Sequence, residues 1–460
     1  MNSAKLLRAI ASGEMSASEA CTDAIARIER LDAKVNAFTG HTFDRARDEA
    51  RRVDEQRARG ESLPPLAGLP YAVKNLFDIE GVTTLAGSKV NRDLPPAHAD
   101  AVLVNRMKGA GAVLLGGLNM DEYAYGFTTE NTHYGPSRNP HDTTRTAGGS
   151  SGGSGAAVAA GQVPLALGSD TNGSIRVPAS FCGVWGLKPT FGRLSRRGTF
   201  PFVHSIDHLG PIADCVETLA LSYDAMQWPD PLDPGCHAQR VQPVAARLGS
   251  GVQGLRIGVL GGYFHDNASE PAREAVALAA QTLSAMDEVT WPDPALGRAA
   301  AFIVSASEGG SLHLPGLRER TQDFEPHSVD RFIAGALQPA HWYVRAQRFR
   351  RSYRDKVNAL FSKWDVLLCA ATPVSAPLIG EEWITVNGQR FPCRPSIGLL
   401  TQPVSFAGCP VVAAPMWPQG TGGMPIGVQV IAAPWREDLA LRAAAVLQTA
   451  GVAGLKEADL

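Results

Sequence analysis

Two loops made almost entirely of small residues constrain the fold of this chain more than any other feature. Residues 148–154 read Gly-Gly-Ser-Ser-Gly-Gly-Ser, and residues 168–174 read Gly-Ser-Asp-Thr-Asn-Gly-Ser. A flexible linker also uses Gly and Ser, but its flanks are polar or disordered. Here the segments between the two loops, 155–160 and 163–167, are apolar and typical of a buried helix and a buried strand. The pattern therefore predicts two tight turns inside a folded core.

From residue 69 onward, short apolar runs alternate with longer stretches of helical periodicity. Such alternation favours an α/β fold, in which a sheet is covered by helices on both faces. The stretch 229–251 is rich in Pro, Gly and polar residues and is expected to be a surface loop or hinge. The predicted strands are 69–74, 112–115, 165–167, 257–260, 366–369, 411–414 and 426–431, and the predicted helices include 156–160, 270–286 and 342–360.

The first 60 residues have a helical pattern. Ser16 and Glu19 form a plausible capping box at the start of an amphipathic segment. A second, charged helix is expected over 43–59 and ends before Pro64 and Pro65, which block its continuation. We therefore expect a helical N-terminal lead-in over 1–60 and a main domain over 61–460, together forming one structural unit.

Charge and hydropathy exclude several classes of protein. The chain has 43 Lys and Arg against 45 Asp and Glu, with no basic stripe, so direct nucleic-acid binding is not expected. Its start lacks a secretion signal and no window approaches a membrane span, which favours a cytoplasmic protein without membrane contact. Its histidines and cysteines are not spaced as metal ligands, so neither a metal nor a cofactor is expected.

The small-residue loops offer the parts of an amide hydrolase. Ser174 follows an apparent strand in a tight turn, where Gly173 lets backbone N–H groups converge on a developing oxyanion. Lys74 ends an apolar segment that would carry its ammonium group into the interior, and burial lowers a lysine pKa from about 10.4 towards neutrality. Two alternatives stay open at this point, because Lys74 can be a snorkelling surface residue and a histidine can be the base.

The same residues resemble the amidase signature family. The motifs at 148–154 and 168–176, the Phe-Cys-Gly-Val-Trp-Gly-Leu-Lys-Pro-Thr segment at 181–190, the lysine segment at 72–75 and the block at 205–211 match in order. The resemblance implies a large mixed β-sheet covered by helices on both faces, with residues 61–460 as the catalytic domain.

The resemblance also assigns roles to individual residues. It makes Ser174 the nucleophile, Ser150 a bridging serine that follows a cis peptide bond, and Lys74 the terminal base of a Ser-cisSer-Lys triad. The backbone N–H groups of residues 171–174, namely Thr171, Asn172, Gly173 and Ser174, would form the oxyanion hole. A different interpretation, an α/β-hydrolase with Ser150 as nucleophile in a G-x-S-x-G pattern, leaves Lys74 and Ser174 without roles.

One residue of the oxyanion turn departs from the family. Members usually carry two glycines before the nucleophile, whereas this chain has Asn172 followed by Gly173. Asn tolerates left-handed dihedral angles well, so the turn is expected to survive, and the amide is a candidate substrate contact. The further candidate substrate contacts are Tyr125, Arg176 and Arg350. Arg176 can equally be a support of the loop with Asp170, and the helix of Arg350 can be a solvated face.

Several segments narrow the choice of substrate. Residues 119–124, 129–131 and 135–140 resemble A subunits of tRNA-dependent amidotransferases, in which an acid that holds the glutamine amino group precedes a Leu-Leu-Thr segment. Here that position is Gly398, which disfavours an ammonium group. Residues 424–438 resemble amidases of bacterial cyanuric acid breakdown. The resemblances imply hydrolysis of a linear C–N bond in a small anionic ureide such as 1-carboxybiuret or biuret, with release of ammonia.

Two other functions remain as alternatives. One is the glutaminase A subunit of a tRNA-dependent amidotransferase, and the other is a non-catalytic scaffold subunit. The resemblance to A subunits also implies a small helical partner like the C subunit of those enzymes. We therefore expect a homodimer or a heterotetramer.

Overall fold

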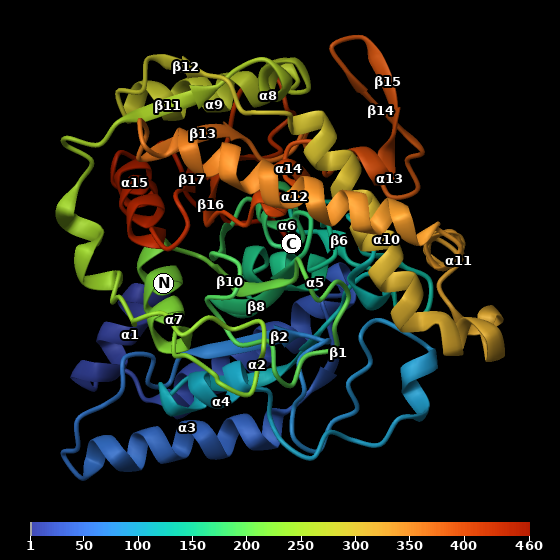
Figure 1. Cartoon of the computed structure of the whole chain (residues 1–460). Coiled ribbons are helices and arrows are strands. Elements are labelled where there is room, and N and C mark those ends of the chain that lie inside the picture. The colour runs from blue at the N-terminus through green and yellow to red at the C-terminus, as the bar shows by residue number, and fades with distance from the viewer. Residues whose placement is uncertain (1) are drawn as a thin grey trace.

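A computed structural model describes residues 2–460 and contains a mixed sheet of eleven strands. The sheet runs across the molecule, with helices on either side (Figure 1). Strands β2, β3 and β8 are parallel neighbours, as are β11, β12 and β13, and the strands between these groups pair antiparallel. In spatial order the strands are β1 (Phe38–His41), β3 (Val113–Leu118), β2 (Pro70–Lys74), β8 (Leu165–Asp170), β10 (His208–Ala213), β9 (Trp185–Lys188), β16 (Val411–Met416), β17 (Ile426–Ala432), β13 (Val366–Ala370), β11 (Ile257–Leu260) and β12 (Asp287–Val289).

The described chain also contains three two-stranded sheets, fifteen α-helices and four short 3₁₀-helices, which span 90–93, 122–124, 245–250 and 321–323. The strand pairs are β4 (Glu130–Asn131) with β5 (Gly135–Pro136), β6 (Arg138–Asn139) with β7 (Asp142–Thr146), and β14 (Trp383–Val386) with β15 (Gln389–Pro392). The helices are α1 (Ser3–Ser12), α2 (Ala17–Val35), α3 (Phe43–Ala58), α4 (Val102–Gly109), α5 (Gly152–Ala159), α6 (Arg176–Cys182), α7 (Val216–Met226), α8 (Tyr263–Asp266), α9 (Glu270–Thr282), α10 (Pro294–Glu319), α11 (Val329–Ala336), α12 (Ala340–Leu360), α13 (Cys393–Ser396), α14 (Gln402–Ala407) and α15 (Glu437–Thr449).

Around β2, β3 and β8, the two faces of the sheet belong to two separate hydrophobic cores. In β2, Tyr71 and Val73 pack into one core, which includes α4 and α7, while Ala72 packs into the other, which includes α2, α3 and α5. Successive side chains of a strand point to opposite faces, so Lys74 shares the face of Ala72. That face is the one covered by α5, which begins inside the Gly-Ser run, at Gly152. The α/β prediction, with helices on both faces, is confirmed.

The N-terminal segment largely follows its prediction. The capping box of α2 is present, with the Glu19 N–H donating to Ser16 Oγ (3.0 Å) and the Ser16 N–H donating to Glu19 Oε2 (2.8 Å). The expectation of a purely helical lead-in is wrong at one point, because β1 lies between α2 and α3 and pairs with β3. The division into 1–60 and 61–460 stays a prediction.

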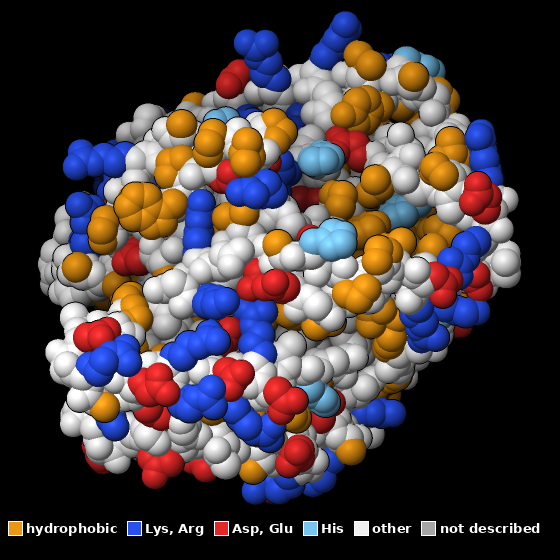
Figure 2. Space-filling model, turned by 90° about the horizontal axis from the view of Figure 1, so that it is seen from below, with side chains coloured by type: hydrophobic (Ala, Val, Ile, Leu, Met, Phe, Trp, Pro, Cys, Tyr) orange, Lys and Arg blue, Asp and Glu red, His pale blue; other side chains and the backbone are white. Residues whose placement is uncertain are grey.

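The surface near α3 matches the balanced charge of the chain. In Figure 2, acidic and basic side chains are interspersed over the face seen from below. On α3 itself, Arg47 pairs with Asp44 (3.0 Å) and Arg51 with Asp48 (2.8 Å). Within residues 2–460, every helix is too short or too polar to cross a membrane.

Candidate active site

Lys74 ends strand β2 and is fully buried. Its Nζ donates hydrogen bonds to Ser150 Oγ (2.6 Å) and to Ser169 Oγ (2.8 Å). This geometry excludes the snorkelling alternative, because a snorkelling lysine keeps its ammonium group in water. Strand β2 therefore delivers an amine to the Gly-Ser loop and to the end of β8.

Burial controls the protonation of Lys74. Loss of solvation lowers the pKa of the Lys74 amine from 10.5 to about 7, while the charges of Asp121, Asp207 and Asp170 oppose this shift. A large fraction of Lys74 is therefore uncharged at neutral pH, as a proton acceptor must be. The expectation that burial brings this pKa towards neutrality is met.

The Gly-Ser loop brings Ser150 and Ser174 into one site. The peptide bond between Gly149 and Ser150 is cis, and the next N–H, that of Ser151, donates to the Ser174 carbonyl (3.3 Å). Ser150 is fully buried and Ser174 is 2% exposed. Over residues 2–460, no hydrogen bond engages Ser174 Oγ, which leaves that hydroxyl group free to meet a substrate.

The turn before Ser174 presents unused backbone donors. In the described part of the chain, the N–H groups of residues 171–174 donate to no acceptor in loops or turns. Gly173 has a φ of 142°, in the region that favours glycine, and a methyl group there would collide with Thr401 Oγ1. The same Thr401 hydroxyl donates to the Asn172 carbonyl (2.7 Å) and so holds the turn from behind. This arrangement can stabilise an oxyanion.

Asn172 fits the turn for a different reason from the one expected. It is not among the residues with positive φ in the described chain, so its tolerance of left-handed angles is not used. Its side-chain amide donates to Ser305 Oγ on α10 (2.9 Å). Asn172 thereby ties the oxyanion turn to a helix that lies far away in sequence. Its contact with substrate stays a prediction.

Arg176 supports the turn. Both its Nε and its Nη2 donate to Asp170 (2.9 Å each), its Nη1 donates to the Thr401 carbonyl (3.1 Å) and to Gln429 Oε1 (2.6 Å), and Nη2 also donates to Ser405 Oγ. All five guanidinium N–H groups are thus used inside the protein. This arrangement favours the role of Arg176 as a support of the loop, while a contact of Arg176 with a substrate carboxylate stays a prediction.

The two remaining candidate contacts are also held by protein groups. Arg350 is only 6% exposed and donates to the carbonyl groups of Phe406 (3.1 Å) and Ser205 (2.6 Å). The solvated-face interpretation of α12 therefore fails at this residue. Tyr125 is buried, and the guanidinium of Arg331 lies 4.1 Å from its ring centroid. A role for Arg350 or Tyr125 in substrate binding stays a prediction.

The sequence reasoning missed three residues that complete the site. Ser169, the second partner of Lys74, lies in the same motif as Ser174, and strand register could have revealed it. Asp207 accepts a hydrogen bond from Thr171 Oγ1 (2.6 Å), and Thr401 buttresses Asn172. Asp207 and Thr401 come from distant segments, so only the fold reveals their proximity.

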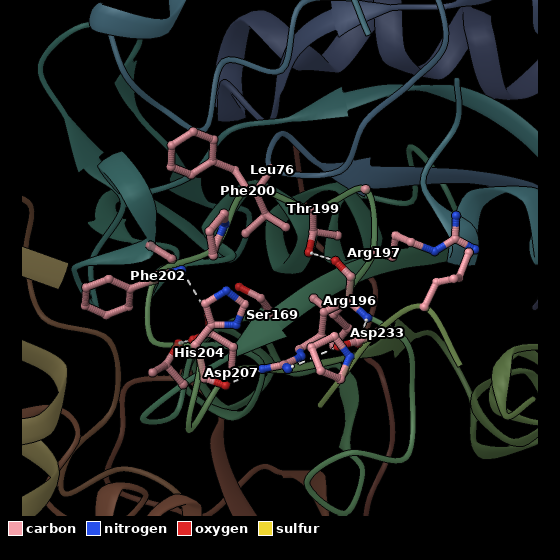
Figure 3. A pocket seen from close by; sticks show the side chains of 17 residues that line it. Leu76, Ser169, Arg196, Arg197, Thr199, Phe200, Phe202, His204, Asp207 and Asp233 are labelled. Carbon is pink, nitrogen blue, oxygen red and sulfur yellow. Dashed lines mark hydrogen bonds and ion pairs between the residues drawn. The ribbon is translucent and has the colours of Figure 1, made fainter. Parts of the chain in front are cut away.

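A cavity of about 240 Å³ lies beside the oxyanion turn, at Ser169 and Thr171 (Figure 3). Ser169, Thr171 and Asp207 give it polar lining, and the aromatic segment 200–202 gives it an apolar side. Arg196 also lines the cavity and is ion-paired to an aspartate 3.3 Å away. A cavity of this size suits a small polar molecule.

The histidine-dependent alternatives fail on geometry. The Nδ1 of His208 is hydrogen-bonded to the Asp170 carbonyl (3.0 Å). Across residues 2–460, neither Ser150 nor Ser174 forms a hydrogen bond with a histidine. The α/β-hydrolase interpretation with Ser150 as nucleophile is therefore wrong, because the group bonded to Ser150 is Lys74.

Comparison with known proteins agrees with this geometry. The amidase family model matches residues 19–441. The chain is 73% identical to AtzE, the 1-carboxybiuret hydrolase subunit of Pseudomonas sp. (strain ADP), over 99% of this chain and 100% of that protein. It is 39% identical to the A subunit of the glutamyl-tRNA(Gln) amidotransferase of Moorella thermoacetica, over 94% of this chain and 92% of that protein. A chain of a solved vestigial protein complex, one that reveals the evolutionary origins of an s-triazine catabolic enzyme, superposes with a TM-score of 0.99 at 72% identity, covering 99% of this chain and 100% of that one. This chain belongs to the amidase signature family of hydrolases, which act on C–N bonds.

Proposed function

We propose that the protein hydrolyses a linear C–N bond of a small anionic ureide, most specifically 1-carboxybiuret, with biuret as a close analogue. The buried hydrogen bond from Lys74 to Ser150 carries the chemical part of the proposal, because it places a neutral amine against a bridging hydroxyl group. The choice of substrate rests on the 73% identity to a subunit of 1-carboxybiuret hydrolase, over the full length of that subunit. A role in the breakdown of cyanuric acid follows from the same relationship.

In the first half of the reaction, Ser174 Oγ attacks the carbonyl carbon of the scissile C–N bond. Ser174 passes its proton to Ser150, and Ser150 passes its own to neutral Lys74. The oxyanion that forms is stabilised by the unused N–H groups of residues 171–174. The protons then return along the same route to the leaving nitrogen, the C–N bond breaks, and ammonia departs from a carbamoyl- or acyl-serine.

In the second half, a water molecule attacks the carbonyl carbon that is bonded to Ser174. Its proton moves through Ser150 to Lys74, the ester bond breaks, and the returning proton restores the Ser174 hydroxyl group. Both halves need Lys74 uncharged at the moment of attack, which its lowered pKa of about 7 supports.

The glutaminase alternative is disfavoured by the surroundings of Gly398. A glutamine substrate carries an α-ammonium group that needs a carboxylate partner, and Gly398 supplies none. The scaffold alternative is disfavoured because Lys74, Ser150 and Ser174 are all retained.

A substrate panel tests the proposal. Purified protein is supplied with 1-carboxybiuret, biuret and glutamine, and released ammonia is measured. We expect the highest kcat/KM on 1-carboxybiuret and none above background for the Ser174→Ala control. Activity on glutamine alone would overturn the substrate assignment, while labelling of the protein by a serine-directed phosphonate without any turnover would leave only the amidase chemistry.

We also propose that the protein works in a cytoplasmic complex. The relative at 73% identity is one subunit of its enzyme, and the solved relative is a protein complex. A small helical partner that resembles the C subunit of tRNA-dependent amidotransferases fits this relationship, as a heterotetramer; a homodimer is the simpler alternative. Native mass spectrometry of the complex purified from cells that express the native operon gives the subunit composition and decides between the two. Full activity of a partner-free chain would contradict a required partner.

A further inference from the structure

Four peptide planes carry the N–H groups of the oxyanion turn, and three of them are held through their carbonyl groups. Because a trans peptide unit is planar, a hydrogen bond to its C=O also fixes the direction in which its N–H points. The three bonds run from His208 Nδ1 to the Asp170 carbonyl (3.0 Å), from Thr401 Oγ1 to the Asn172 carbonyl (2.7 Å) and from the Val177 N–H to the Gly173 carbonyl (2.7 Å). These bonds set the N–H groups of residues 171, 173 and 174.

The fourth plane, which joins Thr171 to Asn172, is held in another way. Among residues 2–460, no group donates to the Thr171 carbonyl. Side chains at the two ends of the plane restrain it instead. Thr171 Oγ1 donates to Asp207 Oδ1 (2.6 Å), and Asn172 Nδ2 donates to Ser305 Oγ (2.9 Å). The direction of the Asn172 N–H therefore depends on these two side-chain bonds.

Ser305 offers a rigid anchor for one of them. It is fully buried on α10, and this helix packs against α11, α12 and α14 (Figure 1). Two turns earlier on the same helix, Arg298 Nε donates to Oε1 of Gln402 (2.8 Å), the residue after Thr401. Helix α10 thus holds the oxyanion turn through Ser305 and also contacts the segment that binds the Asn172 carbonyl.

The amide of Asn172 is only partly satisfied by its bond to Ser305. The residue is 7% exposed, and its Oδ1 is buried without a hydrogen-bond partner within residues 2–460. A buried acceptor without a partner costs free energy. A glycine, which family members usually carry here, would remove that cost, but it would also remove the bond to Ser305 and widen the backbone freedom of the turn. The amide is therefore explained by the position in which it holds the turn rather than by added stability.

We infer that Ser305 is a positioning residue for the reaction at Ser174, and that it acts through Asn172 to orient the Asn172 N–H towards the oxyanion. The inference rests on the proposed chemistry of Ser174 but not on the choice of substrate. Without this tether, only the Thr171 side chain still restrains the fourth plane. Complete loss of one oxyanion donor lowers the rate about 10²- to 10³-fold, so misalignment of one donor should lower it about tenfold.

Labelling by a serine-directed phosphonate tests the inference without a substrate. The phosphoryl oxygen takes the place of the oxyanion when Ser174 attacks phosphorus, so the maximal labelling rate reports the alignment of the donors. The half-saturating concentration reports binding. We expect Ser305→Ala and Asn172→Gly each to lower the maximal rate about tenfold and to change the half-saturating concentration less than about twofold. The double variant should be no slower than the slower single variant, because both changes remove the same bond. Additive losses would overturn the inference.

Two further serine variants separate positioning from a loss of stability, which thermal unfolding measures for each protein. Ser305→Thr keeps the hydroxyl group and should restore most of the labelling rate. Ser307→Ala removes a similar bond of the same helix, from Ser307 Oγ to Gln338 Oε1 (2.8 Å), and should label like the wild type. The inference fails if Ser305→Thr is as slow as Ser305→Ala, or if Ser307→Ala is equally slow.

A wild-type labelling rate in folded Ser305→Ala refutes the inference directly. If Ser305→Ala does not fold, Asn172→Gly decides in its place, and an unchanged maximal rate in that variant refutes the inference. Failure of the wild type to be labelled at Ser174 would instead refute the proposed function, because the labelling requires only the nucleophile and its proton acceptors.

Discussion

Ser169 offers a quantitative test of the proposed role of Lys74. Its hydroxyl oxygen accepts a hydrogen bond from Lys74 Nζ at 2.8 Å, and such a bond favours the charged ammonium form. Removing it by Ser169→Ala leaves Ser150 as the remaining hydroxyl partner. A hydrogen bond to a charged group contributes about 1.5 kcal/mol, so the pKa of Lys74 should fall by about one unit, from near 7 to near 6. At pH 6 the uncharged fraction would then rise about fivefold.

The assay follows the rate of labelling of Ser174 by a serine-directed phosphonate between pH 5 and 9, which needs no knowledge of the substrate. The wild-type rate should rise through a pH near the Lys74 pKa of about 7. In Ser169→Ala this rising limb of the pH profile should move towards lower pH. In Ser169→Thr, which keeps the hydroxyl group, the limb should stay at the wild-type pH. A limb that stays in place or moves to higher pH in Ser169→Ala refutes the assignment of the limb to Lys74.

Three further outcomes follow from the same geometry. Ser174→Ala should abolish phosphonate labelling and Ser150→Ala should slow it, with the labelled peptide identified by mass spectrometry; label on Ser150 would contradict the assignment. Arg176→Met should lower the free energy of unfolding by about 3–5 kcal/mol because it leaves the Asp170 carboxylate buried and unpaired, and urea unfolding measures this loss. Lys74→Met should instead stabilise the protein, by up to about 4 kcal/mol at pH 7, because the Lys74 pKa falls from 10.5 to about 7 on folding. The unfolded wild-type chain binds more protons between these two pKa values, so Lys74 makes wild-type stability rise with pH in that window. The rise should be smaller in the variant, where Lys188, whose pKa burial also lowers to about 7, still contributes its part.

The sequence was sufficient for the triad because the relevant information is local. A strand ending in a lysine and two loops of small residues are visible as patterns, and the family resemblance places Lys74, Ser150 and Ser174 in one site. The structure adds the hydrogen bond from Lys74 to Ser150. It also adds Asp207 and Thr401, which reach the oxyanion turn from distant segments, where no local pattern marks them.

The dependence on tertiary contacts also explains why the sequence predicted neither β1 nor α10. Strand β1 has only four residues, including a glycine, and its pairing with β3 is a tertiary contact. Helix α10 is 26 residues long but contains Pro315 and adjacent glycines at 309 and 310, which conceal its periodicity. Those glycines have a tertiary purpose, because a methyl group at Gly310 would collide with the backbone of α11. Residues that look like helix breakers therefore allow close helix packing here.

Asp121 shows why the triad depends on its surroundings. Its N–H donates to the Ser150 carbonyl (3.3 Å), and its carboxylate fills the space that a side chain at Gly149 would need, so it shapes the loop of the bridging serine. Its negative charge also raises the pKa of Lys74 against the effect of burial. Because burial raises the pKa of Asp121 itself to about 6, this charge is lost as the pH falls below that value. Protonation of Asp121 then favours the uncharged form of Lys74, so the two groups must titrate as a pair, and a single-site pH profile describes this active site only above the pKa of Asp121.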